Sequence, residues 1–223
     1  MKVACGFGVL LVICLQSCLV SAACENETNY DPVVTHKAFF DISIGSKPIG
    51  RIVFGLFADL CPYTVRNFAS LVLGNTTNSD WHITCDKSSI FHRTINNFMI
   101  QGGDFTSQNG YGGLSIYGKY FNDENFKLCH HGFGWLGMAN CGPNTNGAQY
   151  YISTVDTPWL DGLHNIFGIV LEGAFVVRAI EKNPTSKGEN IKDRPILAVV
   201  ITDCGMLELE KPFTVPKTPV KEC

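Results

Sequence analysis

Residues 91–106 read FHRTINNFMIQGGDFT, and our interpretation of the chain starts from this stretch. It sets one cation, Arg93, close to two apolar side chains, Phe98 and Met99, and to the amide of Gln101. By spacing alone, Arg93 would be a surface residue, and Phe98 and Met99 would belong to an ordinary core. A functional interpretation therefore needs support from elsewhere in the sequence.

Three further blocks supply that support. They are NGYGGLSIYG at residues 109–118, MANCGPNTNGAQYYIST at 138–154 and WLDGLHNIFGIVLEG at 159–173. Together with residues 91–106 they resemble the cyclophilins, a family of peptidyl-prolyl cis–trans isomerases, in the same order and from about residue 34 to residue 207. The resemblance implies a mainly β fold: a closed eight-stranded antiparallel β-barrel capped by two α-helices.

The resemblance also implies a site. Arg93 matches the catalytic arginine of the family, and Trp159 matches a tryptophan associated there with cyclosporin binding. We therefore expect proline-containing polypeptides as substrates and cyclosporin as a ligand. The residues that we expect to bind substrate, as a proline pocket and an adjoining groove, are His92, Phe98, Met99, Gln101, Ala139, Asn140, Gln149, Tyr151, Trp159, Leu160 and His164.

These residue types suit the isomerisation of an Xaa-Pro bond. Rotation about a peptide bond faces a barrier of ~18–20 kcal/mol because of amide resonance, and it breaks no covalent bond. In the twisted state the prolyl nitrogen becomes pyramidal and basic, so a fixed guanidinium such as that of Arg93 can donate to it and lower the barrier. We expect no metal and no cofactor.

Two positions depart from the family pattern. Tyr151 stands where phenylalanine is usual, and a hydroxyl buried without a partner would cost about 1–3 kcal/mol. We therefore expect the hydroxyl of Tyr151 to reach water or a polar neighbour. Cys141 stands in the groove where alanine is common, which narrows the groove slightly.

Local patterns agree with a β-rich domain. Residues 36–44 and 51–57 alternate like two strands of a hairpin, with Pro48-Ile49-Gly50 as the turn, and residues 195–201 read as a closing strand. One helix starts with Pro62 near its first position and ends before Gly74, and a second covers residues 174–181. Seventeen basic against twenty acidic residues give a net charge of −3. The sequence has no block of basic residues that would bind nucleic acid.

The first 23 residues have the pattern of a cleaved signal peptide. Lys2 precedes an apolar run, and Ser21-Ala22-Ala23 offers small residues for cleavage. The run is too short to cross a bilayer comfortably, so we expect no membrane span in the mature chain. The expected organisation is a signal peptide at 1–23, an arm at 24–33, an isomerase domain at 34–207 and a flexible tail at 208–223, in a monomer.

The rest of the sequence is compatible with the secretory pathway, in the ER lumen or outside the cell. Asn26 and Asn75 begin N-glycosylation sequons. Cleavage after residue 23 would leave seven of the ten cysteines, an odd number, so at least one thiol would be free or intermolecular. The barrel implied by the resemblance brings the two chain ends to one side, which suggests a disulfide between Cys24 and Cys223.

Two other motifs point to different chemistry, and we reject both. Residues 132–137, GFGWLG, match G-x-G-x-x-G, but MANCGPNTNG follows and cannot form the helix that a dinucleotide site needs. His130 and His131 are adjacent without a carboxylate cluster, so we expect core or solvated histidines and no metal.

Two functions remain. The first is an active isomerase that assists protein folding in the secretory pathway. The second is a client-specific chaperone or binding module that uses the same groove with little isomerase activity. Arg93 favours the enzyme, whereas Tyr151 and a long loop at residues 75–89 leave room for the binding module.

Overall fold

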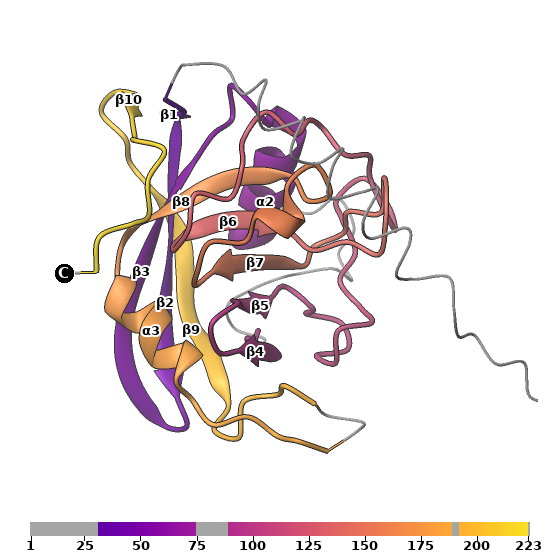
Figure 1. Cartoon of the computed structure of the whole chain (residues 1–223), viewed down its shortest axis with the longest axis vertical. Coiled ribbons are helices and arrows are strands. Elements are labelled where there is room, and N and C mark those ends of the chain that lie inside the picture. Colours follow the sequence, from indigo (N-terminus) through magenta and orange to yellow (C-terminus); the bar gives the residue numbers. More distant parts are fainter. Residues whose placement is uncertain (1–30, 75–88, 189–191, 223) are drawn as a thin grey trace, which may run out of the picture.

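The computed structural model of the chain describes residues 31–74, 89–188 and 192–222, and its centre is one curved antiparallel sheet (Figure 1). The strand order is β4-β5-β7-β6-β8-β3-β2-β9. The strands are β2 (His36–Ile44), β3 (Lys47–Leu56), β4 (Arg93–Ile95), β5 (Met99–Gly102), β6 (Trp135–Met138), β7 (Tyr150–Ser153), β8 (Ile166–Glu172) and β9 (Val199–Leu207). The sheet wraps around the main core, into which β2 sends the alternate side chains of Ala38, Phe40 and Ile42. Strands β3 and β8 instead bury five consecutive residues each.

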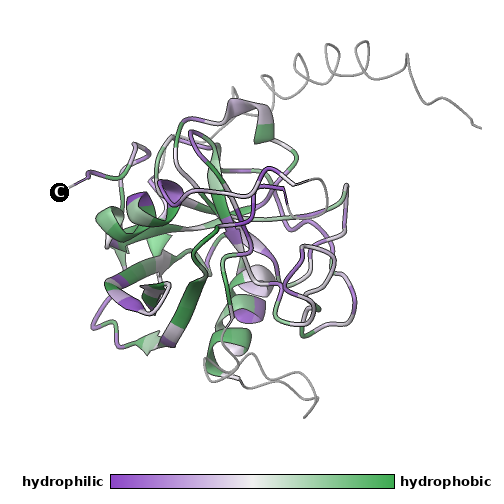
Figure 2. Cartoon of the chain, turned by 90° about the horizontal axis from the view of Figure 1, so that it is seen from below, coloured by the Kyte–Doolittle hydropathy of each residue, from purple (hydrophilic) through white to green (hydrophobic). Residues whose placement is uncertain are grey.

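Two α-helices occur in the described residues, and both contribute to this core. They are α2 (Pro62–Leu73), which lies against β9, and α3 (Ala174–Glu181), which lies against β3. Pro62 occupies the start of α2, and Gly74 ends it in the left-handed conformation with φ 66°. Both helices were predicted at these positions. Figure 2 shows that hydrophobic segments concentrate on the sheet and the helices, whereas hydrophilic segments are common in the loops.

The sheet forms part of a barrel and is not closed by a continuous ladder. Among the described residues, the segment before β4 meets the other edge strand, β9, only at an isolated bridge between Ile90 and Val200. Two hydrogen bonds flank this bridge, from Phe91 N to Val199 O at 3.0 Å and from Ile201 N to Ser89 O at 2.9 Å. The pairing with β9 does not continue into β4. The backbone N–H of Thr94 in β4 binds Asp193 O at 2.7 Å instead. The prediction of a mainly β fold with eight antiparallel strands and two helices is confirmed, but the closed barrel is not.

Two local predictions need correction. Pro48, Ile49 and Gly50 lie inside β3 and not in a turn, because Gly45 provides the left-handed residue of the turn two positions before Lys47. The predicted closing strand at 195–201 instead begins at Val199 and extends to Leu207. It is longer because β2 offers a partner along nearly its whole length.

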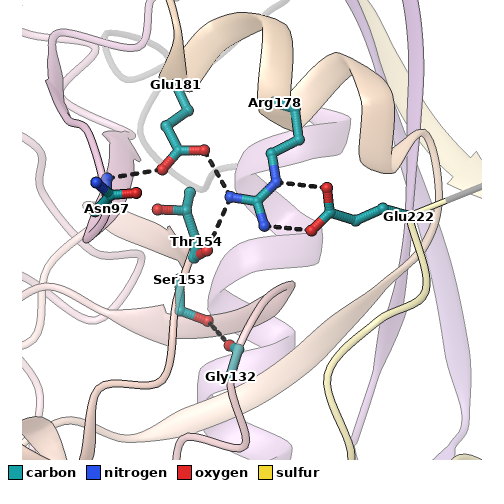
Figure 3. Close-up of polar contacts among 7 residues, drawn as sticks. All are labelled: Asn97, Gly132, Ser153, Thr154, Arg178, Glu181 and Glu222. Carbon is teal, nitrogen blue, oxygen red and sulfur yellow. Dashed lines mark hydrogen bonds and ion pairs between the residues drawn. The ribbon is translucent and has the colours of Figure 1, made fainter.

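The C-terminal segment is packed against the sheet, although its composition predicts a flexible tail from residue 208. Strand β10 (Phe213–Thr214) pairs with β1 (Val33–Val34), so the N-terminal arm also ends one residue earlier than expected. Val215 is buried in a small apolar cluster with Trp135. Near the end, Arg178 on α3 holds both carboxylate oxygens of Glu222 (Figure 3). A few apolar side chains and one ion pair therefore order a segment that is otherwise polar.

Several predictions fall outside the described residues. They concern the signal peptide at 1–23, most of the arm, both sequons at Asn26 and Asn75, and the disulfide between Cys24 and Cys223. Within the described residues, Cys61 and Cys141 are free thiols, while Cys129 and Cys204 are disulfide-bonded. No helix in this part of the chain has the length and apolar character needed to cross a membrane.

Candidate active site

Strand register brings the central residues of the site into one row. Arg93 on β4 pairs with Gln101 on β5, and Gln101 pairs in turn with Tyr151 on β7. Directly opposed residues of antiparallel strands point to the same face, so these three side chains lie side by side. Tyr151 also opposes Gly137 on β6, which extends the row by one strand. Met99 precedes Gln101 by two residues on β5 and shares its face.

Arg93 is the cation of this row, and its guanidinium is available to a ligand. Its side chain is 44% exposed, and Nε lies 3.6 Å from Asp193 Oδ2, which is a weak ion pair. Beside it, Gln101 Nε2 donates to Gln149 Oε1 at 2.8 Å. Gln149 in turn donates to the carbonyl oxygens of Gly110 and Gly112 at 2.9 and 2.7 Å. The two amides therefore have fixed orientations next to a half-exposed cation.

The apolar part of the predicted site is also brought together. Phe98 lies 5.8 Å from Trp159 between ring centroids, and Trp159 belongs to a short 3₁₀ helix, Pro158–Leu160. Leu160 O accepts the backbone N–H of His164, so the 3₁₀ turn also positions that histidine. The ring of His164 packs edge-on against Tyr151 at 5.6 Å.

His164 is held in one tautomer. Its Nδ1 lies 2.9 Å from Met138 O, and a carbonyl can only accept, so Nδ1 carries the proton. Burial lowers the pKa of His164, although this hydrogen bond acts in the opposite direction. The lowered pKa keeps the ring neutral near pH 7. A neutral ring suits a pocket for an uncharged proline side chain.

The hydroxyl of Tyr151 has the polar partner that the sequence requires. Its Oη lies 2.5 Å from His130 Nε2, and the two rings stack with an interplanar angle of 11°. His130 Nδ1 lies 2.6 Å from Asp161 Oδ1, which also accepts the backbone N–H of His130. Burial, followed by the charge of Asp161, raises the pKa of Tyr151 well above its usual value, so the hydroxyl keeps its proton and donates to His130.

Sequence reasoning missed both His130 and Asp161 as supporting residues. They lie 21 and 10 residues from Tyr151 along the chain, so no local spacing connects them. His130 is a core histidine, as one of the two expected alternatives stated, and it lies behind the site. The only indication in the sequence was indirect: a buried tyrosine hydroxyl at position 151 needs a hydrogen-bond partner.

A groove adjoins the row on the side of the amides. It is a cavity of about 210 Å³ that includes four predicted residues, Gln101, Ala139, Asn140 and Gln149. The backbone of Ala139 donates to Gln149 O at 3.0 Å, and Asn140 Nδ2 donates to Leu163 O at 2.9 Å, so both walls are fixed. The exposed Cys141 also lines the groove, as the sequence suggested. Other lining residues that the prediction omitted are Gly110, Tyr111, Gly112, Gly113, Leu114, Lys119, Tyr120, Thr145 and Gly147.

The loop over the groove is organised by a buried carboxylate. Asp104 is fully buried and accepts backbone N–H bonds from Ser107, Asn109, Gly110 and Gly112 at 2.8–3.1 Å. Burial alone would raise the pKa of Asp104, but these four donors lower it overall. The charge of Asp104 therefore fixes the loop whose carbonyl groups hold Gln149.

His92 lies beneath the same loop. It is 5% exposed, and among the described residues neither ring nitrogen has a hydrogen-bond partner. Burial lowers the pKa of His92, so the ring is neutral near pH 7. In the described residues, no group of three or more His, Cys, Asp or Glu side chains could hold a metal ion.

The fold and this site define a class of protein: a β-rich domain with a peptide-sized groove, an apolar pocket and one guanidinium beside it. The chain belongs to the cyclophilin family, because residues 39–206 match the model described as cyclophilin type peptidyl-prolyl cis-trans isomerase/CLD. It is 47% identical over 198 residues to peptidyl-prolyl cis-trans isomerase D of Saccharomyces cerevisiae, which covers 88% of this chain and 84% of that relative.

A second relative is peptidyl-prolyl cis-trans isomerase D of Kluyveromyces lactis. The identity is 50% over 184 residues, which covers 81% of this chain and 48% of the relative. The chain therefore spans about half the length of that protein. These matches confirm the family that the sequence blocks indicated.

Proposed function

We propose that this cyclophilin-type peptidyl-prolyl cis–trans isomerase rotates Xaa-Pro bonds at the row formed by Arg93, Gln101 and Tyr151. The observation that carries the proposal is the register of β4, β5 and β7, which sets a half-exposed guanidinium beside a fixed amide. The proline ring lies against Phe98, Met99 and Leu160, and the groove of about 210 Å³ takes neighbouring residues of the polypeptide.

Arg93 stabilises the twisted amide. When the Xaa-Pro bond rotates, resonance is lost and the prolyl nitrogen gains a lone pair that can accept a hydrogen bond. The guanidinium donates to that nitrogen chiefly in the transition state, so the interaction lowers the barrier more than it tightens substrate binding. Gln101 orients a peptide carbonyl group, because its Nε2 donates one N–H to Gln149 and keeps the other for the substrate. Both N–H groups of Gln149 bind Gly110 O and Gly112 O, so Gln149 serves to hold Gln101 in place.

The direct test is an isomerisation assay on the purified chain with a short Xaa-Pro peptide. We expect cis–trans exchange to accelerate in proportion to enzyme concentration. Binding of the peptide without acceleration would overturn the enzyme proposal and leave the binding module or chaperone. The binding-module alternative uses the same groove, so it predicts the same affinity for the peptide.

We also propose that the chain acts in the secretory pathway, in the ER lumen or after export. The signal-like segment at 1–23 supports this location, and so do the disulfide bonds of Cys129 and Cys204, since disulfides persist in oxidising compartments. The test is expression of the full chain in a glycosylating host. Loss of residues 1–23 and a glycosidase-sensitive mass at Asn26 or Asn75 are expected; a full-length, unmodified cytosolic product would contradict the proposal.

Cyclosporin is the proposed small-molecule ligand, and the proposed active species is a monomer. Trp159 is 56% exposed and lies next to Phe98, so its indole ring is available to an apolar ligand. Calorimetry should detect cyclosporin binding to the wild-type chain, and Trp159→Ala should weaken it. Sedimentation should give the mass of one chain; a concentration-dependent dimer would contradict the monomer proposal.

A further inference from the structure

A second cavity lies beside Arg93 and is rich in positive charge. Its volume is about 280 Å³, and its lining includes Arg93, Gln101, Tyr111, Lys192 and Arg194. It shares Gln101, Gly110 and Tyr111 with the groove of about 210 Å³, so the two cavities adjoin. We refer to it below as the cationic cavity.

Three cations converge on this cavity in a chain whose net charge is −3. Within the described residues, the side chains of Lys192 and Arg194 form no hydrogen bond and no ion pair. The nearby carboxylate of Asp193 approaches Arg93 only to 3.6 Å, and Asp193 is not part of the lining. Lys192 and Arg194 therefore give the cavity an excess of positive charge that no side chain of the described residues neutralises.

One neutral side chain completes the wall. His92 belongs to the lining and is 5% exposed, and both of its ring nitrogens are buried. Because burial lowers the pKa of His92, its neutral ring adds no fourth charge to the cavity.

We propose that the cationic cavity is a subsite for the carboxylate of an Asp or Glu side chain near the substrate proline. A guanidinium binds a carboxylate through two parallel N–H bonds, and Arg194 provides one that is not already paired. The subsite starts at Arg93 and Gln101, the residues assigned above to the Xaa-Pro bond, so the acidic residue lies within a few positions of the proline. This inference rests on the proposed function and specifies its substrate class.

The test compares matched peptides that carry Glu or Gln at each of three positions on either side of one proline. For the wild-type chain, we expect kcat/KM for the Glu peptide to exceed that for the Gln peptide by about two- to fivefold at one position. The ratio should fall as salt is raised, because charge pairs at a partly exposed site are screened. A ratio near one at every position would overturn the inference.

Variants locate the effect. Arg194→Gln and Lys192→Gln should each move the Glu:Gln ratio toward one. Lys187→Gln is the matched control, since it removes an exposed cation of the same loop that does not line the cavity. A ratio that survives in the first two variants, or is lost in Lys187→Gln, would also overturn the inference.

Dissociation constants for the same peptides separate this inference from the proposed function. If the wild-type chain accelerates no peptide, the proposed function fails. The Glu:Gln ratio of Kd values, measured by calorimetry, then still decides whether the cavity selects a carboxylate. Equal Kd values at all positions would reject the subsite.

Discussion

The hydroxyl of Tyr151 lies 2.5 Å from Nε2 of His130, and this contact connects a residue of the candidate site to a histidine in the core. His130 is in turn held by Asp161, so the ring of Tyr151 has one fixed position beside Gln101. A phenylalanine at this position would fill the same space without the anchor.

Tyr151→Phe should therefore destabilise the protein. It leaves a buried nitrogen of His130 without its partner, and we expect a loss of about 1–3 kcal/mol in the free energy of unfolding, measured with urea. Tyr150→Phe is the matched control, because Tyr150 is equally buried and its hydroxyl has no partner among the described residues. Equal losses for the two variants would contradict the role of the hydrogen bond.

Gly137 leaves space for this hydroxyl. A Cβ atom at Gly137 would lie 2.5 Å from Tyr151 Oη, too close for any real contact, so Gly137→Ala must displace the ring or the strand. Displacement of the ring breaks the hydrogen bond to His130, and Tyr151→Phe removes the same hydrogen bond. The double variant therefore loses that hydrogen bond once, whereas the sum of the single variants counts it twice. The double variant Gly137→Ala/Tyr151→Phe should be less destabilised than the sum of the single variants, by about 0.5 kcal/mol or more. Additive losses in urea unfolding would show that the two positions act independently.

Local signals in the sequence predicted the elements that depend on local chemistry. Pro62 and Gly74 mark the ends of α2, and the alternation in residues 36–44 matches β2. Long-range contacts were not predictable in this way. The partner of Tyr151 comes from a distant loop, and the C-terminal segment is ordered by Val215 and Glu222, which its polar composition conceals.

The catalytic role proposed for Arg93 predicts a specific kinetic result. Arg93→Ala should reduce kcat by one to three orders of magnitude, equivalent to about 1.4–4 kcal/mol of barrier. Arg93→Lys should also be impaired, because an ammonium lacks the planar fork of donors. Peptide affinity should change much less, since Phe98 and Met99 still form the pocket. A folded Arg93→Ala protein with near wild-type turnover would refute the role.

Asp104 predicts a pH dependence of stability. Its pKa in the folded protein is lower than the ordinary value of 3.8, so its contribution is complete above that value and is lost as the pH falls through the lower, folded pKa. Asp104→Asn should thus be less stable than wild type at pH 7, and the difference should shrink progressively below about pH 4. Urea unfolding over this range measures it, and a difference that grows on acidification would contradict the assignment.

Arg178 predicts a link between the C-terminal segment and the proline pocket (Figure 3). It binds Glu222, Thr154 O at 2.9 Å and Glu181 Oε2 at 2.7 Å. The other oxygen of Glu181 accepts Asn97 N at 2.8 Å, in the turn just before Phe98. The guanidinium of Arg178 therefore connects the C-terminal segment to the turn that directly precedes Phe98.

The two carboxylates of this network should respond differently. Glu181 is 3% exposed, so Arg178→Ala leaves a buried charge without its cation and should cost about 3–5 kcal/mol of unfolding free energy. Glu222 is half-exposed, and Glu222→Gln should cost at most about 1 kcal/mol. Arg51→Ala, which breaks the exposed pair with Asp41, is the control and should have a small effect.

A second substitution tests the mechanism of that loss. Glu181→Gln in the Arg178→Ala background removes the uncompensated charge but keeps an oxygen that can accept Asn97 N, so it should restore part of the stability. Arg178→Ala should also raise KM, because Glu181 then no longer holds Asn97 and the neighbouring Phe98 in place. Glu181→Gln in this background should lower the KM again. If Arg178→Ala has a wild-type KM, or if Glu181→Gln destabilises it further, the guanidinium does not connect these two parts of the molecule.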